Sequence, residues 1–461
     1  MNIQTITKKF NAGIRWNAFF FAIRKSLSTV VLILLYRRLP TNVFSIWANL
    51  YSALFLLLLW LDFGFKKSLP RFCPIFSKNK NALKKFIRYI VLFQSVALVV
   101  ALPLFAIVTK YITTRYNTLL DKSSLFYLGC MLFITEGILA VFRLIFHSRF
   151  WQKQFNSKMA LIVTVKTVII MLLIVSPLAN IPLLQCIFLS DIAAGLIAIF
   201  ISIAMLRSLY KDKDYPGNEP INFKKTTKAF AKHSAIMWIN NNLKSLTERN
   251  FLLLFFTNIF GPGPANAFKV ANDGALFFYR TIKKTIGTTD TALLAHVETL
   301  PQKSALMPQA FTNLTMKIAR LSIPLLSILC IVILNFKDTF FTNQFIFNAF
   351  CLITICYLIE SLLSPYERML EVKRNYWMLL VAYIPYSIII LLFLFPHLLT
   401  QVGLLSTIII IHVLRLLSYL IMIYFNKKTY LITFPVKAIT KMLATVIPLV
   451  FLASLLIKYF K

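Results

Sequence analysis

Acidic residues are scarce in this sequence. Only 15 Asp and Glu stand against 50 Lys and Arg in 461 residues, and charged residues make up 14% of the chain. Soluble domains carry about 25% charged and about 45–50% apolar residues, whereas 59% of this chain is apolar. The mean hydropathy is +0.75. This composition excludes an ordinary soluble globular protein.

Cysteine and histidine are also few, and neither forms a reactive pattern. The six cysteines lie singly, mostly inside apolar runs, without a CxxC motif or a Cys/His cluster. We therefore interpret them as small buried hydrophobic residues and expect no metal site. The five histidines are scattered, and neither a nucleophile–base set nor a carboxylate pair stands out. The sequence therefore predicts that the protein is not an enzyme.

The excess of basic residues has two interpretations. In a soluble protein a net charge of +35 would suggest a nucleic-acid ligand, but neither an RNA-binding motif nor a separate basic domain is present. In a membrane protein, Lys and Arg concentrate in the cytoplasmic loops. We therefore expect the lipid bilayer, and no nucleic acid, as a partner. The polar N-terminus lacks a small-residue cleavage site, so no removed signal peptide is expected.

Apolar runs of about 20 residues, long enough to cross a bilayer, recur along the whole chain. A β-barrel would show short alternating segments, and these do not dominate. The predicted class is an all-α polytopic membrane protein. Its spans are expected near 13–36, 42–64, 88–109, 125–147, 159–177, 183–207, 235–257, 265–288, 315–336, 343–365, 376–396 and 402–424, with a thirteenth apolar run at 440–457.

Loop charges give the orientation. With a cytoplasmic N-terminus, the inward-facing segments carry about 30 Lys and Arg and the outward ones about 8. The longest loop, 209–234, faces inward, and the outward turns are short and almost uncharged. If the charged segment 265–288 did not cross, the basic loop 425–441 would face outward. Segment 265–288 is therefore predicted to be the eighth span.

The long inward loop separates two halves of six spans each, and a weak internal match supports duplication. Residues 16–54 resemble residues 238–276, with Trp16 aligned on Trp238. Because six is even, both halves enter the membrane with the same orientation, as in parallel-repeat transporters with a substrate site between the repeats. The predicted domains are an N-terminal lobe (1–208), a cytoplasmic linker (209–234), a C-terminal lobe (235–424) and a basic loop with an extra helix (425–461).

Ionisable groups inside spans usually face a bundle interior or a water-filled cavity. Ten basic and six acidic residues stand out within the predicted spans, and such a surplus of bases suits an anionic ligand. The predicted substrate-binding residues of this cationic cavity are Arg24, Lys25, Lys244, Arg249, Lys269, Arg280 and Lys284. The acids predicted to couple an ion or to pair helices are Asp62, Glu136, Asp191, Glu248, Asp273 and Glu360.

The eighth span places its charges on one face. Lys269, Asp273, Arg280 and Lys284 are spaced by four, seven and four residues, which aligns them along a helix. This stripe would be about 22 Å long at 1.5 Å per residue. Two alternatives remain: Lys269 and Asp273 could neutralise each other, and Lys283 and Lys284 could extend to the cytoplasmic interface.

The seventh span repeats this pattern. Asn240, Lys244 and Glu248 are also spaced by four, so consecutive polar faces predict one shared cavity. Glu248 and Lys244 could alternatively form a neutral i,i+4 pair. Lys166 in the fifth span could face the substrate or pair with Glu136, and the sequence does not decide between these roles.

Two segments carry a resemblance to a known family. VVLILLYRRLPTNVFSIWANLYSALFLLLLWLDFGF (30–65) has a helix, a short outer turn and a second helix ending in Asp-x-Gly before a basic loop, and FLLLFFTNIFGPGPANAFKVANDGALFFYR (251–280) corresponds to it. Over nearly the whole chain, the sequence resembles the polysaccharide-type flippases of the multidrug/oligosaccharidyl-lipid/polysaccharide (MOP) exporter superfamily, which include O-antigen flippases.

This resemblance implies two six-helix lobes around a V-shaped central cavity with alternating access. It implies transport of an undecaprenyl-diphosphate-linked oligosaccharide to the periplasmic leaflet of a bacterial inner membrane, for O-antigen or another surface polysaccharide. A Na+ or H+ gradient would be coupled without other cofactors, and a polysaccharide polymerase and chain-length machinery would be partners. The thirteenth apolar run departs from twelve spans; it is an extra helix, as in fourteen-span relatives, or a peripheral one. The diphosphate would be held by Arg24, Lys25, Lys269 and Arg280.

Two other functions are weighed against this one. A cation-coupled drug antiporter of the same fold, similar to the MATE transporters, would need an acidic or aromatic cavity, and the excess of bases argues against it. A membrane polysaccharide polymerase or glycosyltransferase would need a sizeable outer loop with acids or histidines. The outward loops are short, and the longest loop is basic and predicted to face inward.

Overall fold

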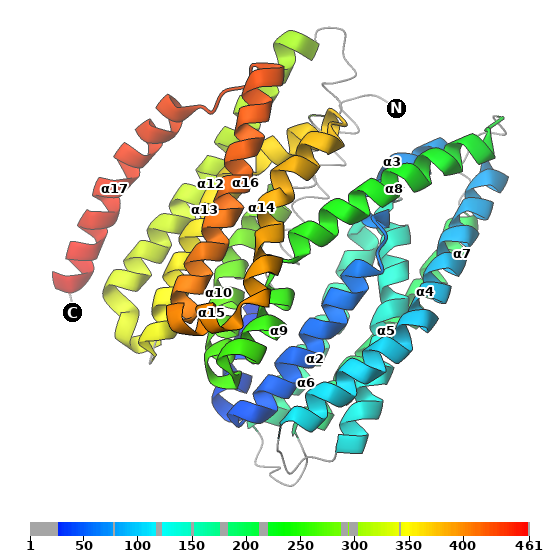
Figure 1. Ribbon diagram of the computed structural model, residues 1–461, viewed down its shortest axis with the longest axis horizontal. Coiled ribbons are helices and arrows are strands. Elements are labelled where there is room, and N and C mark those ends of the chain that lie inside the picture. The colour runs from blue at the N-terminus through cyan, green and yellow to red at the C-terminus, as the bar shows by residue number, and fades with distance from the viewer. Residues whose placement is uncertain are drawn as a thin grey trace. The chain divides into compact units, whose positions relative to one another are not determined.

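The computed structural model describes residues 26–76, 79–116, 122–148, 152–175, 183–211, 220–286, 303–340 and 343–459, together with Leu294 (Figure 1). The elements formed by these residues are α-helices. The predicted all-α class is therefore confirmed.

The chain divides into two compact units inside helix α10 (Pro262–Ile286). The N-terminal unit extends from Phe19 to Asn266, and the C-terminal unit contains Ala267–Lys461. The boundary does not coincide with the 209–234 segment, because the seventh span packs with the N-terminal helices. Asn266 ties the first turn of α10 to these helices: its Oδ1 accepts from Ser45 Oγ at 3.1 Å, and its Nδ2 donates to the carbonyl of Thr41 at 3.1 Å.

The N-terminal unit is a helical bundle. Helices α4 and α7 pack on α5, α6 packs on α7, and α2 packs on both α4 and α9. Its helices are residues 26–38, α2 (Thr41–Trp60), α3 (Phe65–Phe76), α4 (Lys80–Arg115), α5 (Lys122–Ser148), α6 (Gln152–Val175), α7 (Leu183–Lys211), α8 (Phe223–Ser245) and α9 (Arg249–Phe260).

The C-terminal unit is a second bundle, in which α16 packs on α13 and α14, and α12 packs on α13 and α17. The thirteenth apolar run forms α17, which lies along α12 through the buried Ile439 and its apolar neighbours. Its helices, besides α10, are α12 (Lys303–Phe340), α13 (Gln344–Val372), α14 (Tyr376–Leu394), α15 (Pro396–Val402), α16 (Leu404–Tyr430) and α17 (Val436–Tyr459).

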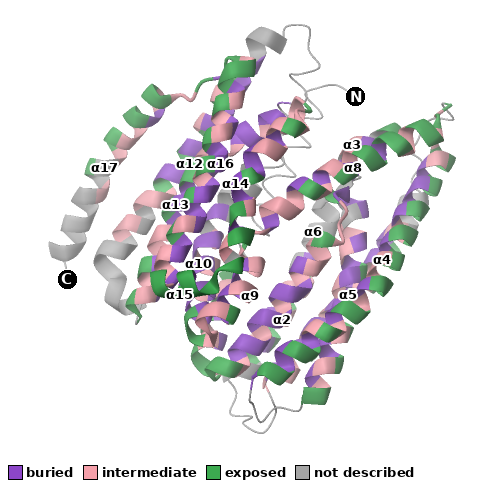
Figure 2. Ribbon diagram, viewed as in Figure 1, coloured by how far each residue is buried: buried purple, intermediate pink, exposed green. Residues whose placement is uncertain are grey.

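Six helices of the described residues are long and apolar enough to cross a membrane, or seven if α14 and α15 form one bent span. These six are α2, α4, α5, α7, α13 and α16. Large apolar side chains remain exposed along their outer faces, most continuously on α4 (Figure 2). Such faces are stable against lipid and not against water. The protein is a multi-pass membrane protein; twelve core spans remain a prediction.

The predicted seventh span is wrong as one continuous helix. Helix α8 begins at Phe223, inside the predicted linker, and ends at Ser245, and α9 begins only at Arg249. Side-chain hydroxyl groups bond to backbone carbonyls at this break. Ser245 Oγ donates to the carbonyl of Asn242 at 2.7 Å, and Thr247 Oγ1 donates to the carbonyl of Lys244 at 2.9 Å. Such local bonds compete with the helical ladder.

The segment between the second and third predicted spans is not a plain loop, because it contains α3 and the start of α4. The turn before α3 depends on Gly64, whose φ of +72° favours glycine. A Cβ at this position would lie 2.2 Å from the carbonyl oxygen of Ser234 and 2.8 Å from the amide nitrogen of Trp238. Helix α8 therefore passes directly over the turn, which anchors α3 and α8 to each other.

Candidate functional site

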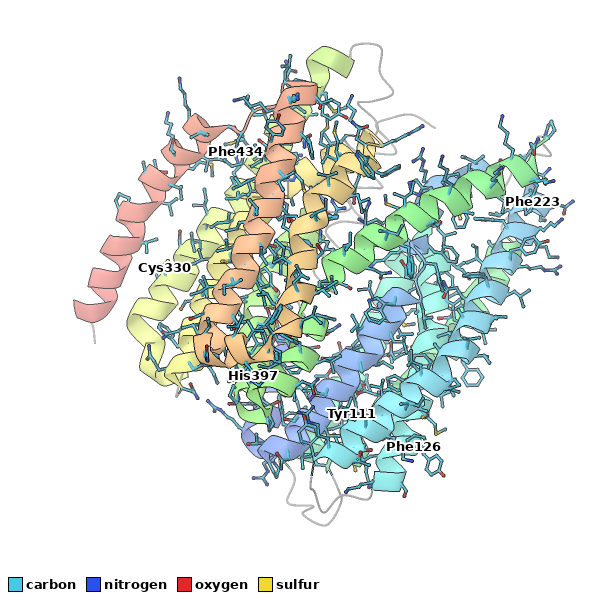
Figure 3. The ribbon with its side chains drawn as sticks, in the orientation of Figure 1. Tyr111, Phe126, Phe223, Cys330, His397 and Phe434 are labelled. Carbon is cyan, nitrogen blue, oxygen red and sulfur yellow. The ribbon has the colours of Figure 1, made fainter. Side chains whose placement is uncertain are left out.

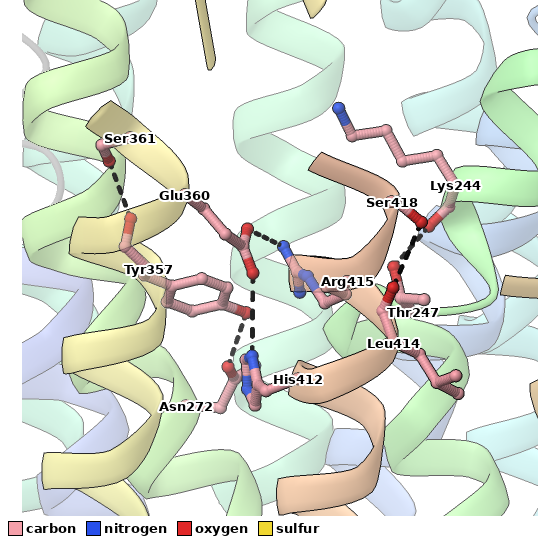
Figure 4. A network of polar contacts seen from close by, with 10 residues as sticks. All are labelled: Lys244, Thr247, Asn272, Tyr357, Glu360, Ser361, His412, Leu414, Arg415 and Ser418. Carbon is pink, nitrogen blue, oxygen red and sulfur yellow. Dashed lines mark hydrogen bonds and ion pairs between the residues drawn. The ribbon is translucent and has the colours of Figure 1, made fainter. Parts of the chain in front are cut away.

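A buried polar network lies among the apolar helices of the C-terminal unit (Figure 4). Glu360 on α13 is fully buried and accepts a hydrogen bond from Arg415 Nη2 on α16. His412 Nδ1 lies 3.7 Å from the other carboxylate oxygen, and Arg415 Cζ lies 4.9 Å from the ring centre of Tyr357. Tyr357 and Glu360, like His412 and Arg415, are three residues apart and so share a helix face. The network thus joins α13 to α16 through side chains that are all buried.

Helix α10 extends this network. Tyr357 Oη donates to Asn272 Oδ1 at 2.9 Å, and the ring of Tyr357 stacks on Tyr279 with centroids 4.9 Å apart. One turn away, Lys269 Nζ lies 3.3 Å from Asp273 Oδ2, and Lys269 is only 3% exposed. The predicted helical face of the eighth span is therefore present in its described part, and Lys269 forms the neutral pair that the spacing allowed.

Two further ion pairs lie in the N-terminal unit. Lys166 on α6 pairs with Asp191 on α7, and the hydroxyl of Tyr51 on α2 also donates to Asp191. On α5, Arg143 Nη2 lies 3.3 Å from Glu136 Oε2. Lys166 therefore pairs with Asp191 and not with Glu136, and its substrate-facing role stays a prediction. The contact across α6, α7 and α2 holds three helices together.

Asp62 has a capping role. The backbone N–H of Lys66 donates to its two carboxylate oxygens, at 3.2 Å and 3.4 Å, so Asp62 holds the first turn of α3. Partial burial in the turn disfavours the charged carboxylate and raises the pKa of Asp62 to about 6, although the charges of Lys66 and Lys67 act in the opposite direction.

The remaining predicted residues of the seventh span do not form the predicted stripe. Glu248 is exposed at the start of α9, so it does not share a helix face with Lys244 and Asn240. Lys244 is half-buried near the end of α8. Arg249 donates from Nε and Nη2 to Asn250 Oδ1, at 3.0 Å and 2.7 Å. The i,i+4 argument fails here because the helix ends between the residues.

Part of the predicted diphosphate site cannot be placed. Arg24 and Lys25 lie outside the described residues, and so do the side chains of Arg280, Lys283 and Lys284. Of the four residues favoured for diphosphate binding, only Lys269 has a described side chain.

Sequence reasoning missed two members of the network and one further buried acid. Arg415 and His412 lie in the predicted twelfth span, and a complete list of ionisable residues in that span would have identified them. Glu367 lies beyond the predicted tenth span, which ends at residue 365, but α13 continues to Val372, and Glu367 is buried and accepts from Tyr383 Oη at 2.7 Å.

Comparisons with known proteins identify the fold. No protein-family model and no curated protein sequence matches this chain. A multidrug-resistance transporter of the MATE family and MOP superfamily, in an outward-facing conformation, is similar with a TM-score of 0.60 and 10% identity, covering 94% of this chain and 97% of that one. The lipid II flippase MurJ, in an inward closed conformation, is similar with a TM-score of 0.61 and 14% identity, covering 94% and 91%.

This chain has the fold of the MOP transporters. A third MOP transporter, from Pyrococcus furiosus and described as having a binding pocket of reverse polarity, is similar with a TM-score of 0.53 and 10% identity, covering 91% and 96%. The similar structures include both a multidrug transporter and a lipid flippase. The fold alone therefore does not identify the substrate. That choice depends on the charges described above.

Proposed function

We propose that this MOP-fold protein is a flippase that moves an undecaprenyl-diphosphate-linked oligosaccharide from the cytoplasmic to the periplasmic leaflet of a bacterial inner membrane, for O-antigen or another surface polysaccharide. The observation that carries the proposal is the charge balance within the helices. Four of the six acids predicted for the spans are ion-paired with a base: Glu136, Asp191, Asp273 and Glu360. A cationic drug would need an acid that is not already neutralised, whereas a diphosphate needs bases beyond those that pair with acids, and the ten bases singled out in the predicted spans outnumber the six acids.

In the proposed mechanism, basic side chains bind the diphosphate while the polyprenyl tail stays in lipid. Burying a diphosphate without compensating charge is costly, and Arg and Lys offset this cost with charge-assisted hydrogen bonds. The lobes would alternate access to the two sides of the membrane, driven by a Na+ or H+ gradient, without catalysis of a covalent reaction. The proposed contacts are Arg24, Lys25, Lys269 and Arg280, with Lys244, Arg249 and Lys284 in supporting positions.

Lys269 contributes differently from the other three favoured bases. Because it is paired with Asp273, its charge reaches a substrate only if the diphosphate replaces the carboxylate as its partner. Arg24, Lys25 and Arg280 are therefore the sharper test. A polysaccharide polymerase and chain-length machinery would receive the product on the outer side of the membrane.

The experiment is export of lipid-linked glycan in cells whose own copy is replaced by Arg24→Ala, Lys25→Ala or Arg280→Ala. Losing a hydrogen bond to a charged group costs about 1.5–3 kcal/mol, so each variant should lose about tenfold or more in export. Lys427→Ala, at an exposed position in the last turn of α16, is the matched control and should export normally. Normal export in all three variants would refute diphosphate binding by these residues.

A drug antiporter is the second candidate, because MATE transporters share the fold. Drug resistance on expression, together with normal glycan export in cells lacking the protein, would favour it over the flippase. Glycan chain extension by the purified protein would instead favour the polymerase or glycosyltransferase alternative.

A further inference from the structure

Helix α4 presents a continuous apolar stripe whose length matches a bilayer. The exposed apolar side chains recur every three or four residues, from Tyr89 at 50% exposure to Tyr111 at 56%. These ends are separated by about 33 Å along the helix at 1.5 Å per residue, close to the hydrocarbon thickness of about 30 Å. Tyrosine at both ends is typical of the two membrane interfaces. The stripe consists of Tyr89, Leu92, Phe93, Val96, Val99, Val100, Leu104, Ile107 and Tyr111.

On the N-terminal side of Tyr89, the exposed face of α4 becomes basic. Lys80, Lys84, Lys85 and Arg88 are all exposed, within nine residues of one another. Lys85 Nζ lies 6.0 Å from the ring centre of Tyr89, so the change from apolar to basic occurs within one helical turn. These charges therefore lie at the level where the hydrocarbon ends and the phosphates of the lipids begin.

Helix α8 adds a second basic row beside this one. Lys224, Lys225, Lys228 and Lys232 are exposed on its first three turns. Lys85 Nζ lies 5.0 Å from the ring centre of Phe223, which connects the start of α8 directly to α4. Figure 3 labels Phe223 at this end of α8, and Tyr111 near the other end of the apolar stripe.

An aromatic core fixes the position of α8. Phe76 on α3 stacks on Phe86 of α4 with centroids 4.0 Å apart, and Phe86 meets Phe230 of α8 edge-on at 4.9 Å. Phe223 lies 5.5 Å from Phe76. Helices α3, α4 and α8 contain no Asp or Glu in their sequences. The packing therefore holds the two basic rows next to each other without an acid from these helices between them.

We propose that this basic surface, formed by Lys80, Lys84, Lys85, Arg88, Lys224, Lys225, Lys228 and Lys232, binds the phosphate groups of anionic phospholipids. The ligand is lipid because the surface continues directly into the lipid-facing stripe of α4. Because these basic groups are exposed, folding does not strip them of water. Each basic residue near an anionic membrane strengthens binding by about fivefold. By the positive-inside asymmetry, the leaflet is the cytoplasmic one. Bound lipid would hold α3 and α8 at the membrane surface.

The experiment measures binding of a fluorescent short-chain phosphatidylglycerol to the full-length protein in neutral detergent, with phosphatidylcholine of the same chain length as the reference. The protein should bind phosphatidylglycerol more tightly. Lys225→Gln/Lys228→Gln should weaken this binding by about fivefold to thirtyfold, as expected for two charges. Lys427→Gln/Lys428→Gln removes two exposed charges from the end of α16 and should change it by less than about twofold.

Three results would overturn the proposal: equal binding of the two lipids, an equal loss in both Gln pairs, or full competition by inorganic phosphate at the concentration of the lipid. The last would indicate a site for soluble anions. Lys225→Arg/Lys228→Arg keeps the charge and should bind as the unmodified protein does, which separates loss of charge from damage to α8. The inference does not depend on the proposed flippase activity, because none of the eight residues is a proposed diphosphate contact.

Discussion

The ion pair between Glu360 and Arg415 gives the most direct test of the described network. Glu360 is fully buried and Arg415 is 6% exposed, so both charges are withdrawn from solvent. Arg415→Met keeps most of the side-chain volume but leaves the carboxylate buried without its guanidinium partner. Removing one partner of a buried pair costs about 3–5 kcal/mol, because the remaining charge is uncompensated.

This cost can be converted to a change in melting temperature. The C-terminal unit contains 195 residues from Ala267 to Lys461. At about 2.1 cal/mol/K per residue its unfolding entropy is about 0.4 kcal/mol/K, so 3 kcal/mol corresponds to about 7 °C. If all 461 residues unfold as one transition, the same cost corresponds to about 3 °C. Arg415→Met should therefore lower Tm by at least about 3 °C.

The assay is thermal unfolding of the full-length protein in detergent, for Arg415→Met, Glu360→Leu and the double variant. Replacing both members of a buried pair by apolar residues is often neutral, so the double variant should be more stable than Arg415→Met alone. Lys427→Met, on an exposed residue of the same helix, should change Tm by less than about 1 °C. If the two single losses simply add in the double variant, the side chains do not interact as described, and the reasoning fails.

Three other perturbations test the described contacts. Gly64→Ala should strongly destabilise the fold, by more than about 3 kcal/mol, because the Cβ meets backbone atoms at a position of positive φ; Gly263→Ala, with open space around it, should be tolerated, as thermal unfolding would show. Asp62 has its pKa raised to about 6 in the fold, so it binds a proton more strongly there than in the unfolded chain; its contribution to stability should fall as pH rises from about 4 to 6 and stay constant above, and Asp62→Asn should abolish this dependence of Tm. Lys166→Met should lower Tm by several degrees, and Lys166→Met with Asp191→Leu should restore most of it.

The all-α membrane class could be predicted because it depends on composition and on the length of apolar runs. Helix α17 was predicted for the same reason. The pairing of Lys269 with Asp273 could also be predicted, because the two residues lie four positions apart within one uninterrupted helix. In each of these cases the evidence is local in sequence.

Other features depend on which helix faces meet, and a sequence does not state this. Lys166 pairs with Asp191 across two helices, although Glu136 was the acid considered. The predicted stripe of Lys244 and Glu248 assumed a continuous helix, and hydroxyl groups around Thr247 break it. The missed Arg415 could have been found as an ionisable residue, but its pairing with Glu360 could not have been predicted.

These pairs bear on the choice between substrates. An acid within an apolar bundle can bind a cationic substrate only if its own base is displaced, and that displacement leaves the base buried and uncompensated. An anionic substrate that replaces the acid keeps the base compensated, but it leaves the displaced acid uncompensated in turn. A diphosphate that replaced Asp273 as the partner of Lys269 would leave the carboxylate without its base, just as a cationic drug that bound Asp273 would leave Lys269 without its acid. The ion pairs themselves therefore favour neither charge, and the preference for an anionic substrate rests on the bases singled out in the predicted spans, which outnumber the acids by ten to six.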